Sequence, residues 1–412
     1  MTEEYKKEVI EILENLGKQL DISETQYNEA VKSYEAVGDW LSKEGSPLYP
    51  YNPRILPQGS FMLGTIIKPI NDEDDIDIDL VCKLNGKPIY WTQKHLKDAV
   101  GNRLKDHSTY KEMIEDKDGG RRCWTLEYSD NANYHMDILP SISDKNFTVL
   151  LSESFNNSQH IDANKLAIRI TDKEEYHYST ETDTEWWMKS NPFGYAKWFY
   201  QRAIYSSTKM FALSESVDPV KPYQKEKMPL QRVIQLLKRH RDIMFCSDEL
   251  DSENRPISII ITTLAARAYD RSENIVDAYV NIVSTMRGFI ETKLNRKTGR
   301  YERWVSNPVN DEENFADKWS DVPQKEEYFY KWLDKLEEDL ETIKYSQGVG
   351  LQRLNESFSA QYGDKVVNKA FADYGENNRV LRESGLRKMA GRTGLLGSVG
   401  TSIPNHNFEG NL

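Results

Sequence analysis

The sequence has few of the residues that build a zinc site or a disulfide framework. It contains three cysteines, Cys82, Cys123 and Cys246, and seven dispersed histidines. No Cys-x-x-Cys pair occurs, although structural zinc sites commonly take their ligands from such pairs. We therefore expect no structural zinc, and the scattered thiols fit a reducing cytosol.

Long apolar runs are also absent. No stretch approaches the ~18 apolar residues that identify a membrane-spanning helix. The first residues, MTEEYKKEVIEILENLG, form an amphipathic helical pattern without the apolar centre of a signal peptide. We expect a cytoplasmic protein with no membrane partner.

An excess of positive charge is missing too. The chain has 54 Lys and Arg against 66 Asp and Glu, so its formal net charge is −12. Proteins that hold long nucleic acids normally present a basic face, and general polynucleotide binding is therefore disfavoured. What the chain does have is 38% hydrophobic residues in 412, enough for a sizeable core in two domains or one bilobal unit.

The apolar periodicity divides the chain into an α/β part followed by a helical part. Two helices open the sequence, and Ser23 with Gln26 forms a capping box before the second. Strands are predicted over 75–81, 121–128, 134–139 and 147–151, with a helix over 92–115. Further helices are predicted in PFGYAKWFYQRAI, from Pro229, and over 257–270, 273–291, 325–344 and 346–357. The predicted domains are N-terminal bracing helices (1–54), an α/β core (55–200), a helical lobe (201–385) and a flexible Gly/Ser/Asn-rich tail (386–412).

Acidic residues alternate with apolar ones in the segment DEDDIDIDLVCKL. Alternation in a strand places Asp77 and Asp79 on the same face, roughly 7 Å apart. Two carboxylates this close raise each other's pKa unless a cation lies between them. Asp137 lies in another predicted strand, YHMDILP, and three carboxylates converge if the two strands are neighbours. Such oxygen ligands suit Mg²⁺, and paired ions of this kind assist phosphoryl transfer; the alternative is a solvated acidic face.

The segment before the acidic strand favours the catalytic interpretation. Gly59 permits close backbone approach to a phosphate, and Ser60 can cap a short helix and donate its hydroxyl. A Gly-Ser pair followed by Asp-x-Asp and a later strand aspartate is a specific combination, although Gly-Ser alone is not.

These residues together resemble a known family. Gly59-Ser60, Asp77-Ile78-Asp79 and Asp137 match the pattern of the DNA polymerase β nucleotidyltransferase superfamily. The fuller run GSFMLGTIIKP…DIDLVCKL…YHMDILP is similar to the bacterial relatives of cyclic GMP-AMP synthase and oligoadenylate synthase, the CD-NTases of antiphage signalling. The resemblance covers about residues 55–320.

The resemblance implies an α+β fold, with a polymerase β-type core, a mixed sheet and a helical second lobe. It implies two Mg²⁺ ions as cofactors, with Mn²⁺ as a substitute. Asp77 and Asp79 would hold both ions, and Asp137 would bind the ion nearest the attacking hydroxyl. Gly59 and Ser60 would cradle the β- and γ-phosphates of the donor.

Two residues of the helical part are implied as further triphosphate contacts. In this family a lysine on a helix of the second lobe and a serine at the start of the next helix grip the triphosphate. Lys238 and Ser258 have about the right separation, and Arg241 is an alternative phosphate contact. The competing interpretations are a solvated helix face for Lys238 and an ordinary helix start for Ser258.

The resemblance also implies substrates and partners. The substrates would be ATP or other nucleoside triphosphates, joined by attack of a 2′- or 3′-hydroxyl into a cyclic di- or trinucleotide, with release of pyrophosphate. Activation by double-stranded DNA is not expected, because the chain lacks the Cys/His insertion of the animal synthases. A regulatory protein partner acting through the C-terminal tail, or constitutive activity, fits better. The rival functions are a template-independent RNA nucleotidyltransferase, a linear oligoadenylate synthase and an inactive nucleotide-binding regulator.

Overall fold

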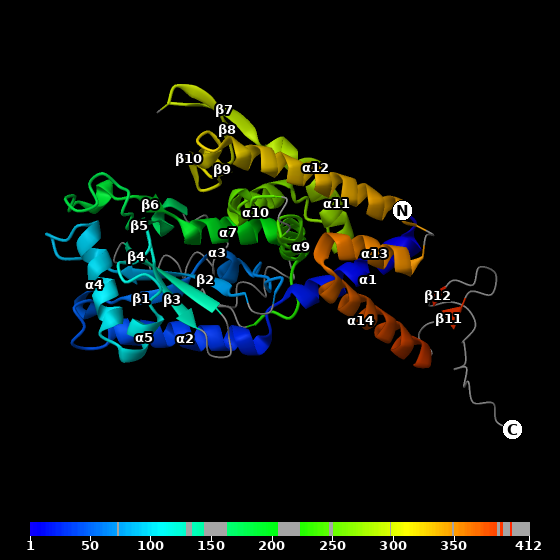
Figure 1. Cartoon of the computed structure of the whole chain (residues 1–412), viewed down its shortest axis with the longest axis horizontal. Coiled ribbons are helices and arrows are strands. Elements are labelled where there is room, and N and C mark those ends of the chain that lie inside the picture. Colours follow the sequence, from blue (N-terminus) through cyan, green and yellow to red (C-terminus); the bar gives the residue numbers. More distant parts are fainter. Residues whose placement is uncertain are drawn as a thin grey trace. The chain divides into compact units, whose positions relative to one another are not determined.

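The computed structural model describes residues 1–71, 74–128, 134–143, 163–204, 223–246, 250–296, 298–347, 350–384, 388–389 and 396–397 (Figure 1). The chain divides into two compact units. The smaller unit combines residues 1–20 with 338–412, and the larger unit comprises residues 21–337. The predicted strand at 147–151 lies outside the described residues.

A six-stranded mixed sheet forms the core of the α/β part of the larger unit (Figure 1). Its order is β1-β2-β4-β5-β6, and β3 also pairs with β4. β2 and β4 run parallel, whereas the other pairs are antiparallel. The strands are β1 (Arg54–Pro57), β2 (Ile76–Leu84), β3 (Trp124–Tyr128), β4 (Tyr134–Ile142), β5 (Ile168–Ile170) and β6 (Lys189–Ser190). The mixed sheet with many helices confirms the predicted α+β class.

The helices of the α/β part bury their apolar faces with the sheet in one core. They are α2 (Glu24–Ser42), the short α3 (Gly59–Leu63), α4 (Gln93–Lys105) and α5 (Ser108–Met113). The capping box of Ser23 and Gln26 is present at the start of α2. Tyr34 of α2, Leu96 of α4 and Leu80 of β2 belong to the same buried cluster.

The single helix predicted over 92–115 is wrong, because the structure has two helices there. α4 ends before Asp106, and the His107 side chain accepts the backbone N–H of Tyr110 at the start of α5. This local cap gives the second helix its own beginning, which apolar spacing alone cannot indicate.

The second half of the larger unit is mainly helical, as predicted. Its helices are α7 (Pro192–Ala203), α9 (Pro229–Met244), α10 (Ser258–Ala268), α11 (Ile275–Thr285) and α12 (Pro323–Tyr345), whose last residues belong to the smaller unit. The helix predicted to reach 291 ends at Thr285. It is followed by the two-stranded pairs β7 (Glu291–Asn295) with β8 (Arg300–Trp304), and β9 (Ser306–Asn307) with β10 (Asn310–Asn314). Short 3-10 turns are η1 (Tyr49–Tyr51), η2 (Ala163–Leu166), η3 (Thr184–Trp186), η4 (Ser252–Asn254), η5 (Met286–Phe289) and η6 (Asp317–Trp319).

The smaller unit joins the two ends of the chain. α1 (Glu3–Leu20) packs against α14 (Asp364–Glu383), and the Gln19 side chain donates to the Asp373 carboxylate at 2.6 Å. α13 (Leu351–Tyr362) begins later than the helix predicted from 346, and α14 was not predicted. Of the expected tail, only the short strands β11 (Lys388–Met389) and β12 (Leu396–Gly397) lie within the described residues. Among the helices of the described ranges, none is long and apolar enough to span a bilayer.

Candidate active site

The register of the sheet brings the predicted carboxylates together. β2 and β4 are paired neighbours, and Asp79 lies directly beside Asp137. Asp77 lies two residues along the same strand, opposite His135. Because Ile76, Ile78 and Leu80 are buried, the acidic residues between them occupy the other face of β2.

The three carboxylates repel one another electrostatically. Burial and the nearby charges of Asp137 and Asp77 raise the pKa of Asp79 to about 6. Burial and Asp137 also raise the pKa of Asp77, while His135 and Arg255 oppose that rise. A cation between such carboxylates would remove the repulsion, so this donor set fits a hard divalent ion.

The carboxylates do not form a ready-made metal cage. Within the described part of the chain, no three His, Cys, Asp or Glu side chains are grouped closely enough to hold an ion. One oxygen of Asp137 accepts a hydrogen bond from the Thr125 hydroxyl on β3 at 2.5 Å. His135 contacts another acidic residue, because its Nε2 lies 2.6 Å from a carboxylate oxygen of Asp75.

The Gly-Ser turn abuts the acidic strand. β1 pairs with β2, and the backbone N–H of Gln58 donates to the Asp79 carbonyl at 2.8 Å. Gly59 has a φ of 57°, and a Cβ at this position would lie 2.3 Å from Asp79 Oδ2. Glycine is therefore required here both by the left-handed backbone and by the approach of the acidic side chain.

Ser60 is not the cap that the sequence suggested. The N-cap of α3 is Gln58, and Ser60 is the second helical residue. Among the residues that the structure describes, none exchanges a hydrogen bond with the Ser60 hydroxyl, so this group can donate to a ligand.

Lys238 is buried in α9, so the solvated-face interpretation is wrong. Its amine donates to the Thr65 carbonyl at 3.1 Å, in the segment that follows α3. Burial, reinforced by the positive charge of Arg241, lowers the pKa of Lys238 to about 7. The negative charges of Asp242 and Asp79 oppose this shift.

Arg241 and Ser258 lie together. Nη1 of Arg241 donates to the Ser258 hydroxyl at 2.9 Å and to the Pro256 carbonyl at 3.0 Å. Ser258 is the first residue of α10, as predicted. Sequence reasoning missed Thr125, whose hydroxyl bonds to Asp137, and Arg255, whose positive charge acts on Asp77. Arg255 stands just before Ser258 in the chain, which was an available signal, whereas Thr125 depends on the antiparallel register of β3.

Fold and site define the class of protein. A mixed sheet with carboxylates on adjacent parallel strands, beside a Gly-Ser turn, is the architecture of a polymerase β-type nucleotidyltransferase. Residues 53–140 match the family model described as the nucleotidyltransferase domain of cyclic GMP-AMP synthase DncV-like proteins.

Similarity to bacterial synthases extends over nearly the whole chain. A c-di-GMP synthase of Roseivirga ehrenbergii is 28% identical over 406 residues, covering 98% of this chain and 97% of that protein. The cyclic dinucleotide synthase CdnG of Bradyrhizobium diazoefficiens is 22% identical, covering 90% of this chain and 84% of that one. The structure of the latter CD-NTase with GTP matches with a TM-score of 0.64, at 20% identity, over 89% of this chain and 99% of that chain. The protein is a nucleotidyltransferase with the CD-NTase fold, and its residues 53–140 match the DncV-like domain model, which confirms the resemblance read from the sequence.

Proposed function

We propose that the protein joins two nucleoside triphosphates, at least one of them GTP, into a cyclic dinucleotide signal. The observation that carries this proposal is the pairing of Asp79 with Asp137 beside the Gly59-Ser60 turn. The guanine preference rests on the c-di-GMP synthase, which is similar over 98% of this chain.

The carboxylates of Asp77, Asp79 and Asp137 would hold two Mg²⁺ ions, and Mn²⁺ would substitute. When bound, the ions supply positive charge at the attacking and leaving oxygens of the phosphoryl transfer. The fit rests on the mutual repulsion of these carboxylates, which raises the pKa of Asp77 and Asp79. The Thr125 hydroxyl holds one oxygen of Asp137 and so fixes how its carboxylate is presented.

The triphosphate side of the site would consist of Gly59, Ser60, Lys238 and Ser258. The Ser60 hydroxyl, which has no partner among the described residues, and the Gly59 N–H would donate to the donor phosphates. Lys238 would add positive charge from α9, and Arg241 would orient the Ser258 hydroxyl, to which it is hydrogen-bonded.

In the reaction, a 2′- or 3′-hydroxyl of one nucleotide attacks the α-phosphorus of the other. A P–O bond forms, the hydroxyl loses its proton, and pyrophosphate leaves with the electron pair of the broken bond. A second attack within the linear product closes the ring and releases a second pyrophosphate. Alignment and electrostatic stabilisation dominate transfers of this type.

Product analysis tests the proposal. The protein is incubated with each NTP alone and with each pair, treated with phosphatase, and analysed by mass spectrometry. A phosphatase-resistant cyclic dinucleotide containing guanine is the expected product. Linear oligonucleotides, which lose their terminal phosphates, would instead support an oligoadenylate or RNA nucleotidyltransferase, and no product from any NTP would support an inactive regulator.

Regulation by a protein partner is proposed on separate grounds. CdnC of E. coli MS115-1 has a similar fold, with a TM-score of 0.51. One of its solved structures is a complex with HORMA-deltaN. For this chain we propose that the C-terminal segment provides the contact with such a partner, in the cytoplasm. Double-stranded DNA is not proposed as an activator.

A further inference from the structure

Side chains on and just before α9 hold the chain between the Gly-Ser helix and the acidic strand. Five of them donate to backbone carbonyls of residues 63–69, here called the 63–69 segment. The bonds are Lys227 to Gly64 (2.9 Å), Gln231 to Leu63 (2.8 Å), Gln235 to Ile66 (2.8 Å), Lys238 to Thr65 (3.1 Å), and Arg239 to Lys68 (2.6 Å) and Pro69 (3.1 Å). Apart from Leu63, which ends α3, this partly buried segment belongs to no helix or strand, so its carbonyls need partners of another kind.

The 63–69 segment is continuous with the candidate phosphate site. Its Thr65 N–H donates to the Ser60 carbonyl at 3.0 Å, and Gly64 ends α3 with a φ of 66°. The same segment carries the carbonyl that holds the Lys238 amine. A shift of this segment would therefore move Ser60 and Lys238 together.

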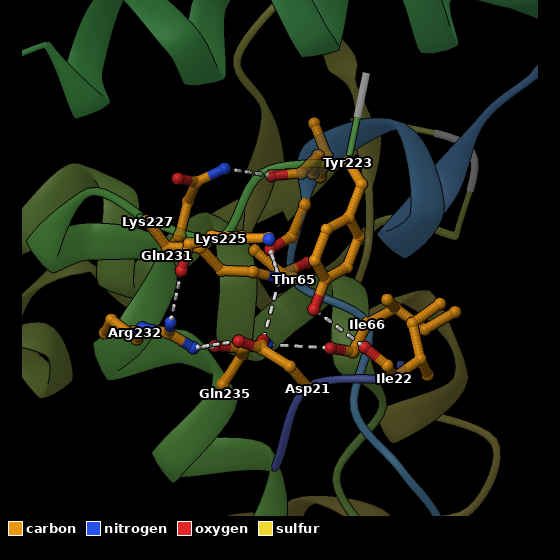
Figure 2. A network of polar contacts seen from close by, with 12 residues as sticks. Asp21, Ile22, Thr65, Ile66, Tyr223, Lys225, Lys227, Gln231, Arg232 and Gln235 are labelled. Atoms are coloured by element: carbon orange, nitrogen blue, oxygen red, sulfur yellow. Dashed lines mark hydrogen bonds and ion pairs between the residues drawn. The ribbon is translucent and has the colours of Figure 1, made fainter. Parts of the chain in front are cut away.

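Asp21 contacts two of the side chains that hold the 63–69 segment, Gln235 and Lys227, and also Arg232 (Figure 2). One of its carboxylate oxygens accepts from Arg232 at 2.8 Å, and the other accepts from Gln235 at 2.9 Å and lies 3.0 Å from the Lys227 amine. Arg232 also donates to the amide oxygen of Gln235 at 3.0 Å. Asp21, Arg232 and Gln235 thus form a closed ring, which fixes the Gln235 amide with its N–H groups toward Asp21 and the Ile66 carbonyl.

The ring depends on the negative charge of the Asp21 carboxylate, which compensates the charges of its cationic partners. Asp21 is buried, as are Arg232 and the side chain of Lys227. Removing a buried negative charge leaves its cationic partners without compensation, and they must move or recruit water. Both cations are connected to the 63–69 segment, because Lys227 bonds to Gly64 and Arg232 bonds to Gln235.

We propose that Asp21 is a positioning residue for the triphosphate side of the active site. Through Gln235, Arg232 and Lys227 it holds the 63–69 segment, and with it Ser60 and Lys238, in the arrangement that receives the donor phosphates. The inference rests on the proposed function. Asp21 would contact neither substrate nor metal, so it is not a catalytic residue.

A second buried aspartate supplies a matched control. Asp172 accepts from Arg121 at 2.7 and 2.8 Å and from Arg122 at 2.7 Å, so it too is a buried carboxylate between cations. In the described part of the chain its carboxylate bonds to Arg121, Arg122 and the Glu174 N–H, and to neither α9 nor the 63–69 segment. Gln93, buried and bonded to the Asp172 backbone N–H, is the corresponding control for Gln235.

The test measures affinity for 2′,3′-dideoxy-GTP, which has no hydroxyl to react, by calorimetry in Mg²⁺, alongside thermal melting. Asp21→Asn should weaken binding about tenfold, whereas Asp172→Asn should stay within about twofold of wild type despite a comparable loss of Tm. Gln235→Met should weaken binding and Gln93→Met should not. If Asp21→Asn fails to fold, the comparison of Gln235→Met with Gln93→Met tests the positioning role.

The experiment distinguishes a failure of the positioning role from a failure of the proposed function. If the wild type binds the nucleotide and makes a cyclic product, but Asp21→Asn and Gln235→Met bind as tightly as their controls, only the positioning role is overturned. If the wild type binds no dideoxynucleotide and makes no product from any NTP, the proposed function fails and the positioning role fails with it.

Discussion

Two single residues show how closely the turn and the acidic strand depend on each other. Gly59 faces Asp79 so closely that any added Cβ would lie 2.3 Å from its carboxylate oxygen, in a backbone with φ of 57°. Gly59 cannot gain a side chain while Asp79 stays in place, because the Asp79 carboxylate fills the space that the side chain would need. The glycine that the sequence linked to phosphate contact thus has a second reason to be glycine, within the protein itself.

Gly59→Ala should reduce cyclic dinucleotide synthesis by about a hundredfold or more, because Asp79 must move and small displacements at a reacting centre are costly. The left-handed backbone should add about 1–2 kcal/mol of destabilisation. Initial rates and thermal melting measure both effects. Gly288→Ala is the control, since no atom lies within 4 Å of its added Cβ. Near-normal synthesis by the Gly59 variant would show that Asp79 tolerates displacement.

Asp79→Asn should abolish synthesis and stabilise the metal-free protein above about pH 6. The pKa of Asp79 is raised from 3.8 to about 6, so the folded state holds this proton more tightly than the unfolded state does. Stability is therefore lost as pH rises from about 4 to about 6, and the loss persists at higher pH. At about 1.4 kcal/mol per pKa unit, the asparagine should recover on the order of 1 to 3 kcal/mol at pH 7.5.

Thermal melting with EDTA, from pH 5 to pH 8, measures this gain, and product assays with Mg²⁺ measure the loss of synthesis. Asp74→Asn, on the exposed residue whose carboxylate accepts from Asn71, should leave both quantities unchanged. Synthesis by Asp79→Asn within about tenfold of wild type would contradict the metal-ligand assignment.

Lys238 should make nucleotide binding depend on pH. Its pKa is lowered to about 7, so in the free protein its positive charge is present below about pH 7 and is lost above it. The KM for GTP should rise between pH 7 and pH 9 in the wild type, as the attraction for the triphosphate fades. Lys238→Met should have a higher KM at pH 6.5 and a flatter pH profile. Equal slopes in both proteins would assign the pH dependence to another group.

At the scale of elements, the sequence predicted best where a pattern is local. Alternation identified β2, the Ser23 capping box identified the start of α2, and Pro229 marked the start of α9. The errors came where a local cap or a turn overrides periodicity. His107 starts α5 within one apolar pattern, and the pattern predicted to continue to 291 gives way to a hairpin whose turn includes Gly299 at φ of 69°.

The environment of α9 shows why the rest of the site was beyond prediction. Its polar residues, among them Gln231, Gln235 and Lys238, are buried although their spacing suggests a solvated stripe. Their partners are backbone carbonyls at residues 63–69, more than 160 positions earlier in the chain. Backbone carbonyls carry no sequence signal, so only the tertiary structure reveals that this stripe is satisfied internally.

At the scale of the whole molecule, the metal requirement should be purely catalytic. EDTA should stop synthesis, and excess Mg²⁺ or Mn²⁺ should restore it, because carboxylates are the proposed ligands. A zinc-selective chelator should change neither the Tm nor the activity, since the three cysteines and seven histidines are dispersed and form no Cys-x-x-Cys pair. A fall in Tm under the zinc chelator would reveal a structural zinc site.

The last prediction concerns the C-terminal end, where Gly, Ser and Asn dominate from Gly394 onward. Such a composition buries little apolar surface, and every residue proposed for the metal and triphosphate sites lies upstream of position 260. Deleting residues 394–412 should therefore leave the kcat and KM of the purified protein within about twofold of wild type. If a protein partner acts through this segment, the deletion should nevertheless abolish phage protection in cells that produce the variant at normal levels. Unchanged protection would mean that the segment is inert, and a collapse of purified activity would mean that it packs onto the enzyme.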